Sequence, residues 1–83
     1  MPRDAIEKEA VMYNSDMKNM GRRLHGLRVE HGMDTFDVAE ALSLSVESIQ
    51  HYEYGDKTPK IWTIVSYSEL FGVSTDYILK GRP

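Results

Sequence analysis

An all-α fold of five short helices is predicted for this chain of 83 residues. Apolar residues recur at spacings of three and four in successive segments, and a glycine or a turn-forming residue follows each segment. No segment alternates apolar and polar residues as a half-buried strand does. Because the length suits one domain, we expect a helical bundle over residues 16–83, with residues 1–15 forming an N-terminal tail or a short extra helix.

The first helix is predicted over residues 16–30. Its buried face is formed by residues three or four apart, namely Met17, Met20, Leu24 and Leu27. Gly32 follows at the position where a helix C-terminal glycine is common.

Two short helices come next, over residues 35–42 and 46–54. Asp34 and Ser45 precede them as N-caps, whose side-chain oxygens accept from the free N–H groups of the first turn. Gly55 ends the second of these helices. The residues expected to point inward are Val38, Ala39, Leu42, Ile49 and Tyr52.

The last two helices are predicted over residues 60–71 and 75–80. A turn sequence, Asp56 to Pro59, precedes the fourth helix. Its inner face is predicted to contain Ile61, Ile64, Val65, Ser68 and Phe71. Ser74 caps the fifth helix, Gly81 ends it, and Tyr77 with Ile78 or Leu79 is expected to face the core.

Composition excludes several functional classes. The chain has no cysteine and no apolar run of membrane-spanning length, and its N-terminus lacks the pattern of a signal peptide. No nucleophile with a base, phosphate-binding glycine loop or matched carboxylate pair is present. We therefore expect a cytoplasmic protein that is not an enzyme and has no cofactor, metal, membrane or small-molecule substrate. The net charge of −3 is unusual for a nucleic-acid binder.

The segment from Thr35 to Gly55 carries the functional signal. Two short helices joined by a three- to four-residue turn form a helix-turn-helix unit. Ala39 is small enough for the two helices to approach closely, Leu44 fills the gap at the turn, and Ile49 anchors the second helix. The outer side of helix 46–54 is then free to enter a DNA major groove.

The chain resembles the Cro and phage-repressor (Xre-type) helix-turn-helix family over about three-quarters of its length. The matching fragments are LRVEHGM (27–33), DVAEALSLS (37–45), SIQHYEYG (48–55), Pro59 and FGVSTDYILKG (71–81). The resemblance implies a lambda-repressor-like fold and a sequence-specific DNA-binding transcriptional regulator of bacterial or phage type, in particular a repressor. It also implies a homodimer that binds double-stranded DNA and associates through its C-terminal helices.

The resemblance also implies which residues act. The family positions that lie at the DNA correspond to Thr35, Ser45, Val46, Glu47, Ser48, Gln50, His51, Tyr54, Lys57 and Thr58. A further pair, Arg28 and Glu53, matches an internal salt bridge that ties the first helix to the recognition helix. Thr35 is a departure, because the family usually has a longer glutamine there.

Side-chain chemistry suggests the contacts of the recognition helix. Val46 fits a thymine methyl, Glu47 accepts from cytosine, Gln50 pairs with adenine, and His51 donates to guanine or a phosphate. Glu47 and His51 are four residues apart, which favours a surface ion pair over a metal site. Arg22 and Arg23 suit either phosphate contact or a solvated helix face.

Two other features leave alternatives open. The acidic balance, Glu47, Val46 and the absent glutamine favour a protein-interaction module on the same fold, such as an antitoxin, an antirepressor or a phage accessory protein. Phe36, Trp62 and Leu70 are apolar at positions where the family is often polar. We expect the N-terminal segment or a second subunit to cover them.

Overall fold

The structure is a computed structural model that describes residues 14–82, and within that stretch it contains helices and no strand, as predicted. The helices are α2 (Asn14–Glu30), α3 (Thr35–Leu42), α4 (Val46–Tyr54), α5 (Ile61–Phe71) and α6 (Thr75–Lys80). Each bound lies within two residues of its predicted position. Helix α2 begins earlier than expected and takes in residues 14 and 15. The remainder of the predicted N-terminal extension, residues 1–13, lies outside the described residues. None of the described helices is long and apolar enough to cross a membrane.

Local sequence signals fix the helix ends. Asp34 forms a capping box with Asp37: each side chain accepts from the other residue's backbone N–H at 2.9 Å. Ser45 and Ser74 cap α4 and α6 in the predicted way. The tight link between α3 and α4 places Ser43 in the left-handed conformation, with φ of 55°, which is uncommon outside glycine.

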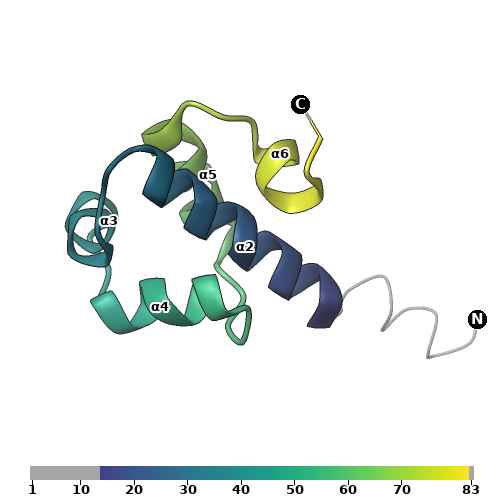
Figure 1. Ribbon diagram of the computed structural model, residues 1–83, viewed down its shortest axis with the longest axis horizontal. Helices are drawn as coiled ribbons and strands as arrows, with labels where there is room; N and C mark the ends of the chain where they lie inside the picture. Colours follow the sequence, from purple (N-terminus) through teal and green to yellow (C-terminus); the bar gives the residue numbers. More distant parts are fainter. Residues whose placement is uncertain (1–13, 83) are drawn as a thin grey trace, which may run out of the picture.

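Helix α2 runs across the middle of the molecule and organises the other helices around it (Figure 1). It packs against α4 on one side and α6 on the other. Helix α3 contacts both α4 and α5, and α5 contacts α6. The helix-turn-helix unit, α3 and α4, is therefore held to the rest of the bundle through α2 and α5.

A single apolar core joins the five helices of residues 14–82. The buried side chains are Met20, Leu24, Leu27, Val38, Ala39, Ile49, Tyr52, Ile64, Tyr67, Phe71 and Ile78. Leu42 and Leu44 are partly buried and pack against this core, so the predicted roles of the turn leucine and of the α3 stripe are confirmed.

The predicted inner face of α5 is partly wrong. Ile64 and Phe71 are buried as expected, but Ile61 is 72% exposed and the unpredicted Tyr67 is buried in its place. Ile61 and Tyr67 lie on opposite flanks of the line from Ile64 to Phe71 on a helix of 3.6 residues per turn. The helix is rotated so that the larger aromatic ring faces the core, where it stacks on Phe71. Val65, another residue assigned to this face, is half-buried.

Candidate nucleic-acid interface

Helix α4 is anchored by one side and open on the other. Ile49 and Tyr52 are buried in the core, whereas Glu47, Gln50 and Tyr54 are exposed. The helix lies along the edge of the molecule, with its far side from α2 facing outward (Figure 1). This arrangement gives α4 the shape required of a rod that enters a groove.

Three predicted site residues meet at the first turn of α4. Ser45 Oγ accepts from the Ser48 backbone N–H at 3.1 Å and donates to Ser48 Oγ at 3.0 Å. Lys57 Nζ donates to Ser48 Oγ at 3.2 Å, although it comes from the loop after the helix. The ammonium also lies 5.5 Å from the centroid of the Tyr52 ring. A cation, two hydroxyls and the N-terminus of a helix therefore gather at one place, which is chemistry suited to a phosphate.

The environment of His51 differs from the prediction. No Glu47–His51 pair forms; instead His51 Nδ1 lies 2.8 Å from Asp56 Oδ1. The edge of the ring also meets Tyr54, with centroids 6.0 Å apart and planes at 86°. Asp56 follows the left-handed Gly55, so the reversal of the chain at the end of α4 brings it back to the helix. The i, i+4 rule missed this partner because it considers only residues within the helix.

The other residues predicted to contact DNA differ in how exposed they are. Val46 was expected to be exposed, but it is half-buried and packs against the core from the first position of α4. Burying its apolar side chain against the core is more favourable than exposing it to water. Less of the Val46 surface is therefore available to contact DNA. Thr35 is half-buried at the start of α3, and Thr58 is exposed in the loop after α4.

The salt bridge that the resemblance implies is formed. Arg28 Nε lies 2.7 Å from Glu53 Oε2, and Arg28 Nη2 lies 3.0 Å from Glu53 Oε1, so the pair is bidentate. The two side chains are 15% and 7% exposed. His25 Nδ1 also reaches Glu53 Oε1, at 2.9 Å. Hydrogen bonding to Glu53 raises the pKa of Arg28 against the opposing effect of burial. This cluster fastens α4 to α2.

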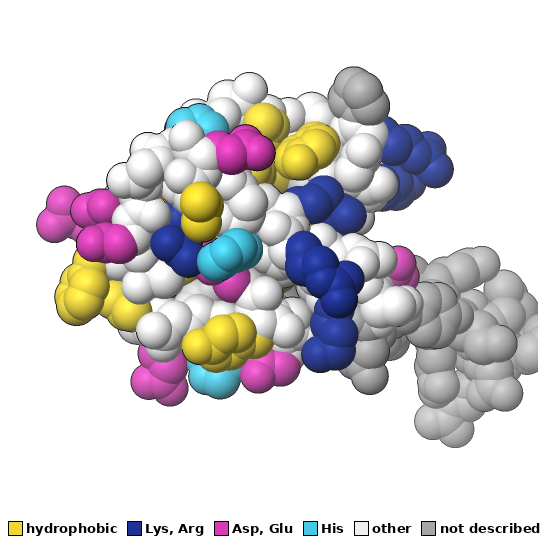
Figure 2. Space-filling model, in the orientation of Figure 1, with side chains coloured by type: hydrophobic (Ala, Val, Ile, Leu, Met, Phe, Trp, Pro, Cys, Tyr) yellow, Lys and Arg dark blue, Asp and Glu magenta, His cyan; other side chains and the backbone are white. Residues whose placement is uncertain are grey.

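Basic side chains lie beside the end of α4. Lys18 and Arg22 are exposed on α2, and Lys18 packs at the C-terminal cap of α4, where a Cβ on Gly55 would lie 2.7 Å from its Cα. Figure 2 shows Lys and Arg side chains gathered along this side, whereas the opposite end carries acidic and apolar groups. Sequence reasoning missed Lys18, although its position four residues before Arg22 on one helix face could have indicated it. Arg23 has a structural role instead, since its Nε donates to the Ile78 carbonyl at 2.8 Å.

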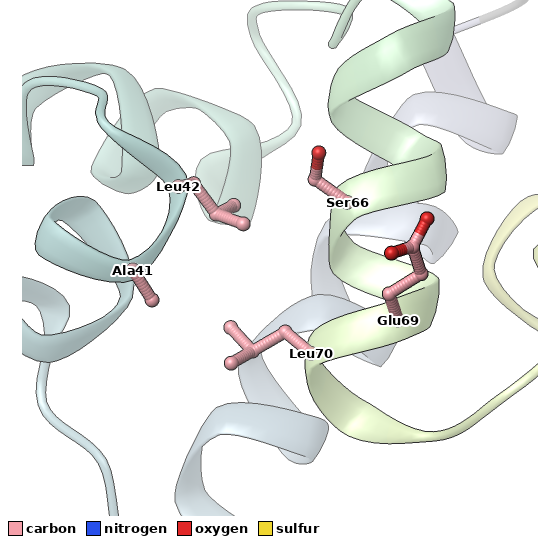
Figure 3. Close-up of a pocket in the computed structure, with 5 residues that line it drawn as sticks. All are labelled: Ala41, Leu42, Ser66, Glu69 and Leu70. Carbon is pink, nitrogen blue, oxygen red and sulfur yellow. The ribbon is translucent and has the colours of Figure 1, made fainter.

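A second surface lies between α3 and α5, away from the outer side of α4. A hollow of about 330 Å³ is lined by Ala41, Leu42, Ser66, Glu69 and Leu70 (Figure 3). Trp62, one turn before Ser66, is 76% exposed, and Phe36 is 72% exposed. Leu70, which we expected to need a cover, is half-buried and already packs against the core.

Comparison with known proteins gives consistent results. A family model described as a helix-turn-helix domain matches residues 21–82. The chain is 34% identical over 61 residues to the SPbeta prophage-derived uncharacterized HTH-type transcriptional regulator YonR of Bacillus subtilis, and this match covers 74% of the chain and 56% of that protein. It is 33% identical over 61 residues to the HTH-type transcriptional regulator ImmR of the same organism, covering 74% and 48%. The chain thus spans about half the length of these regulators.

Among solved structures, the restriction-modification controller protein C.AhdI from Aeromonas hydrophila superposes with a TM-score of 0.72. The match covers 77% of this chain and 97% of that one at 19% sequence identity. At that identity the likeness establishes the fold alone.

Proposed function

Since the chain belongs to the helix-turn-helix domain family, we propose that it binds double-stranded DNA in the cytoplasm and regulates transcription, in particular as a repressor. The observation that carries the proposal is the outer side of α4, which stays exposed while Ile49 and Tyr52 hold the inner side in the core. A major groove about 12 Å wide admits such a helix.

The proposed interface divides into residues that read bases and residues that hold the backbone. Glu47, Gln50 and His51 face outward on α4 and carry the hydrogen-bonding groups that distinguish base pairs. The Ser45–Ser48–Lys57 group at the start of the helix suits one phosphate. Lys18 and Arg22 supply positive charge at the other end. Backbone contacts at both ends of the helix would fix its register along the groove.

The protein is further proposed to act as a homodimer that associates through α5. Trp62, Ser66 and Leu70 follow one another at steps of four residues along this helix, with the small Ser66 at the centre. The Ser66 hydroxyl already donates to the Trp62 carbonyl at 3.0 Å, so it can be covered without losing a partner. A two-fold axis near Ser66 would place Trp62 of each copy over the hollow beside Leu70 of the other.

A protein-binding role on the same fold is the second candidate. It is favoured by the acidic groups Glu47 and Asp56, which flank His51 and would repel phosphates, and by the exposed Phe36. In this case α4 or the first turn of α3 would contact a protein surface instead of a duplex.

Titration of a labelled random-sequence duplex with the full chain separates the two roles. A DNA binder should bind at low salt and lose affinity steeply as salt rises, with a slope in log–log form of about −0.9 for each phosphate neutralised. The acidic variant Lys57→Glu, with Lys80→Glu on α6 as the charge-matched control, checks that binding involves the proposed face. Absence of binding at low salt and high protein concentration would eliminate the DNA-binding role and leave the protein-binding one.

A further inference from the structure

We propose that Asp56 is a positioning residue that decides which bases His51 can read, because it holds the His51 ring in one tautomer. The inference rests on the proposed function and deepens it, since it names the class of base recognised at one position of α4. Side-chain chemistry alone suggested that His51 donates a hydrogen bond to guanine or to a phosphate. The structure assigns it the opposite role, that of an acceptor.

The ring of His51 is held from two sides. Its Nδ1 lies 2.8 Å from Asp56 Oδ1, and its flank meets the Tyr54 ring edge-to-face at a centroid distance of 6.0 Å. The side chain is still 43% exposed. Nε2 makes no hydrogen bond within residues 14–82, so it is the ring atom left for a ligand on the outer side of α4.

The hydrogen-bonding partner fixes the chemistry of that atom. An ionised carboxylate can only accept a hydrogen bond, whereas a neutral imidazole carries one proton on one of its two nitrogens. The proton must therefore lie on Nδ1, where it is donated to Asp56, and Nε2 carries a lone pair. The state of one ring nitrogen is set by the hydrogen bond that the other makes.

An acceptor on α4 selects a particular set of bases. In the major groove the hydrogen-bond donors are the amino groups of adenine and cytosine, whereas guanine presents two acceptors there. His51 should accordingly favour adenine or cytosine on the contacted strand and disfavour guanine. The other charged groups near this part of α4 do not offset the preference, because Glu47 is itself an acceptor and Lys57 is turned toward Ser48.

The test is selection of bound duplexes from a randomised pool at about pH 8, where histidine side chains are in the main neutral. The wild-type chain should enrich adenine or cytosine about 3- to 10-fold over guanine at one position of each half-site, which is the range for one net hydrogen bond. His51→Ala should remove the preference and so identify the position. Asp56→Ala should flatten the same position while other positions keep their preferences.

Asp76→Ala is the matched control, because it removes the same charge from α6, on the other side of α2 from α4. Its charge lies farther from the proposed DNA-binding side of α4, so the substitution should raise affinity for all duplexes no more than Asp56→Ala does, and it should leave base preferences unchanged. An Asp56→Ala pool with the wild-type preference at the His51 position would overturn the inference.

A second measurement needs no DNA. Nitrogen-15 NMR of the free chain should find the ring proton of His51 on Nδ1 in the wild type and redistributed toward Nε2 in Asp56→Ala. A wild-type ring protonated on Nε2 would overturn the inference even if DNA binding is strong. If neither the wild-type chain nor any variant enriches any duplex, the proposed DNA-binding function is wrong, and so is base recognition by His51. The NMR result then decides separately whether Asp56 sets the tautomer of His51.

Discussion

Gly21 lies directly against the backbone of Glu53: a Cβ placed on Gly21 would be 2.5 Å from the Glu53 carbonyl oxygen and 2.8 Å from that of Tyr52. Helix α2 can cross α4 this closely only because Gly21 has no side chain. The same helix holds Gly26, around which nothing lies within 4 Å of an added Cβ.

These two glycines give a matched pair of substitutions. Gly26→Ala should raise the free energy of unfolding by about 0.5–1 kcal/mol, because alanine loses less backbone entropy in a helix. Gly21→Ala should lower it by about 1–3 kcal/mol, since the backbones must move apart. Urea unfolding followed by circular dichroism checks both. Equal effects of the two substitutions would refute the close crossing.

The Arg28–Glu53 pair should be costly to break from one side. Arg28→Ala leaves the 7%-exposed Glu53 carboxylate without its main partner and should destabilise the fold by about 3–5 kcal/mol. Replacing both residues with apolar ones, Arg28→Met with Glu53→Leu, should recover much of that loss. Unfolding free energies of the single and double variants form the cycle. A single-variant loss below about 1 kcal/mol would contradict a buried role for the pair.

The buried Tyr67 should make the stability of the fold depend on pH in the alkaline range. Burial raises its pKa above the usual tyrosine value of about 10, and its hydroxyl has no hydrogen-bond partner within residues 14–82. The phenol binds its proton more tightly in the folded chain than in the unfolded chain. Its contribution to the free energy of unfolding is therefore complete below about pH 10. As the pH rises further, this contribution falls by about 1.4 kcal/mol per pH unit.

Tyr67→Phe removes that dependence and the unpartnered hydroxyl together. At neutral pH this variant should be as stable as wild type or more stable by up to about 1–3 kcal/mol, because an unsatisfied buried group is eliminated. Above pH 10 its stability should fall less steeply. Thermal unfolding of both chains between neutral and alkaline pH makes the comparison, and parallel curves would count against the burial of this hydroxyl.

Lys57 should contribute to DNA affinity without contributing to sequence choice. Lys57→Ala removes one phosphate contact and should reduce the magnitude of the salt slope by about 1, equally for different duplexes. Lys80→Ala, with the same charge change on α6, should leave the slope at its wild-type value. Fluorescence anisotropy over a range of salt concentrations measures both, and equal slopes for the two variants would exclude Lys57 from the interface.

Trp62 should carry most of the self-association energy. Trp62→Ala should raise the dimer dissociation constant by about 30-fold or more, which corresponds to about 2 kcal/mol for a central aromatic anchor. Phe36→Ala is the control, because Phe36 is similarly exposed but lies on the first turn of α3, whereas the hollow borders its last turn. Sedimentation of each variant over a range of concentrations gives the constants; a monomeric wild-type chain would refute the dimer.

Spacing and capping residues predicted the helices closely, because each signal acts within a few residues of the chain. Asp34, Ser45 and Ser74 mark helix starts whatever the rest of the fold does. The rotation of α5 could not be predicted in this way. Its sequence is apolar on several sides, so periodicity allowed both Ile61 and Tyr67 to face inward and only the packing of the bundle decided between them.

The sequence predicted which face of α4 forms the candidate site, but it did not predict which side chains contact one another there. The outer face of α4 follows from the helical period once Ile49 and Tyr52 are placed inside. The partner of His51 depends on the path of the loop after Gly55, and the position of Lys18 depends on how α2 crosses α4. Both are tertiary relationships, which residue spacing along one helix does not encode.

Glu53 holds α4 twice, by its carboxylate on Arg28 and by its carbonyl against Gly21, and this leaves the helix little freedom to tilt. If α4 cannot change its orientation to fit a DNA sequence, the DNA must change its shape to fit α4. In the proposed complex, a poorly matched operator would therefore have to twist or narrow its own groove. The protein should then discriminate between stiff and flexible base-pair steps outside the contacted positions, because these steps differ in the free energy needed to deform them.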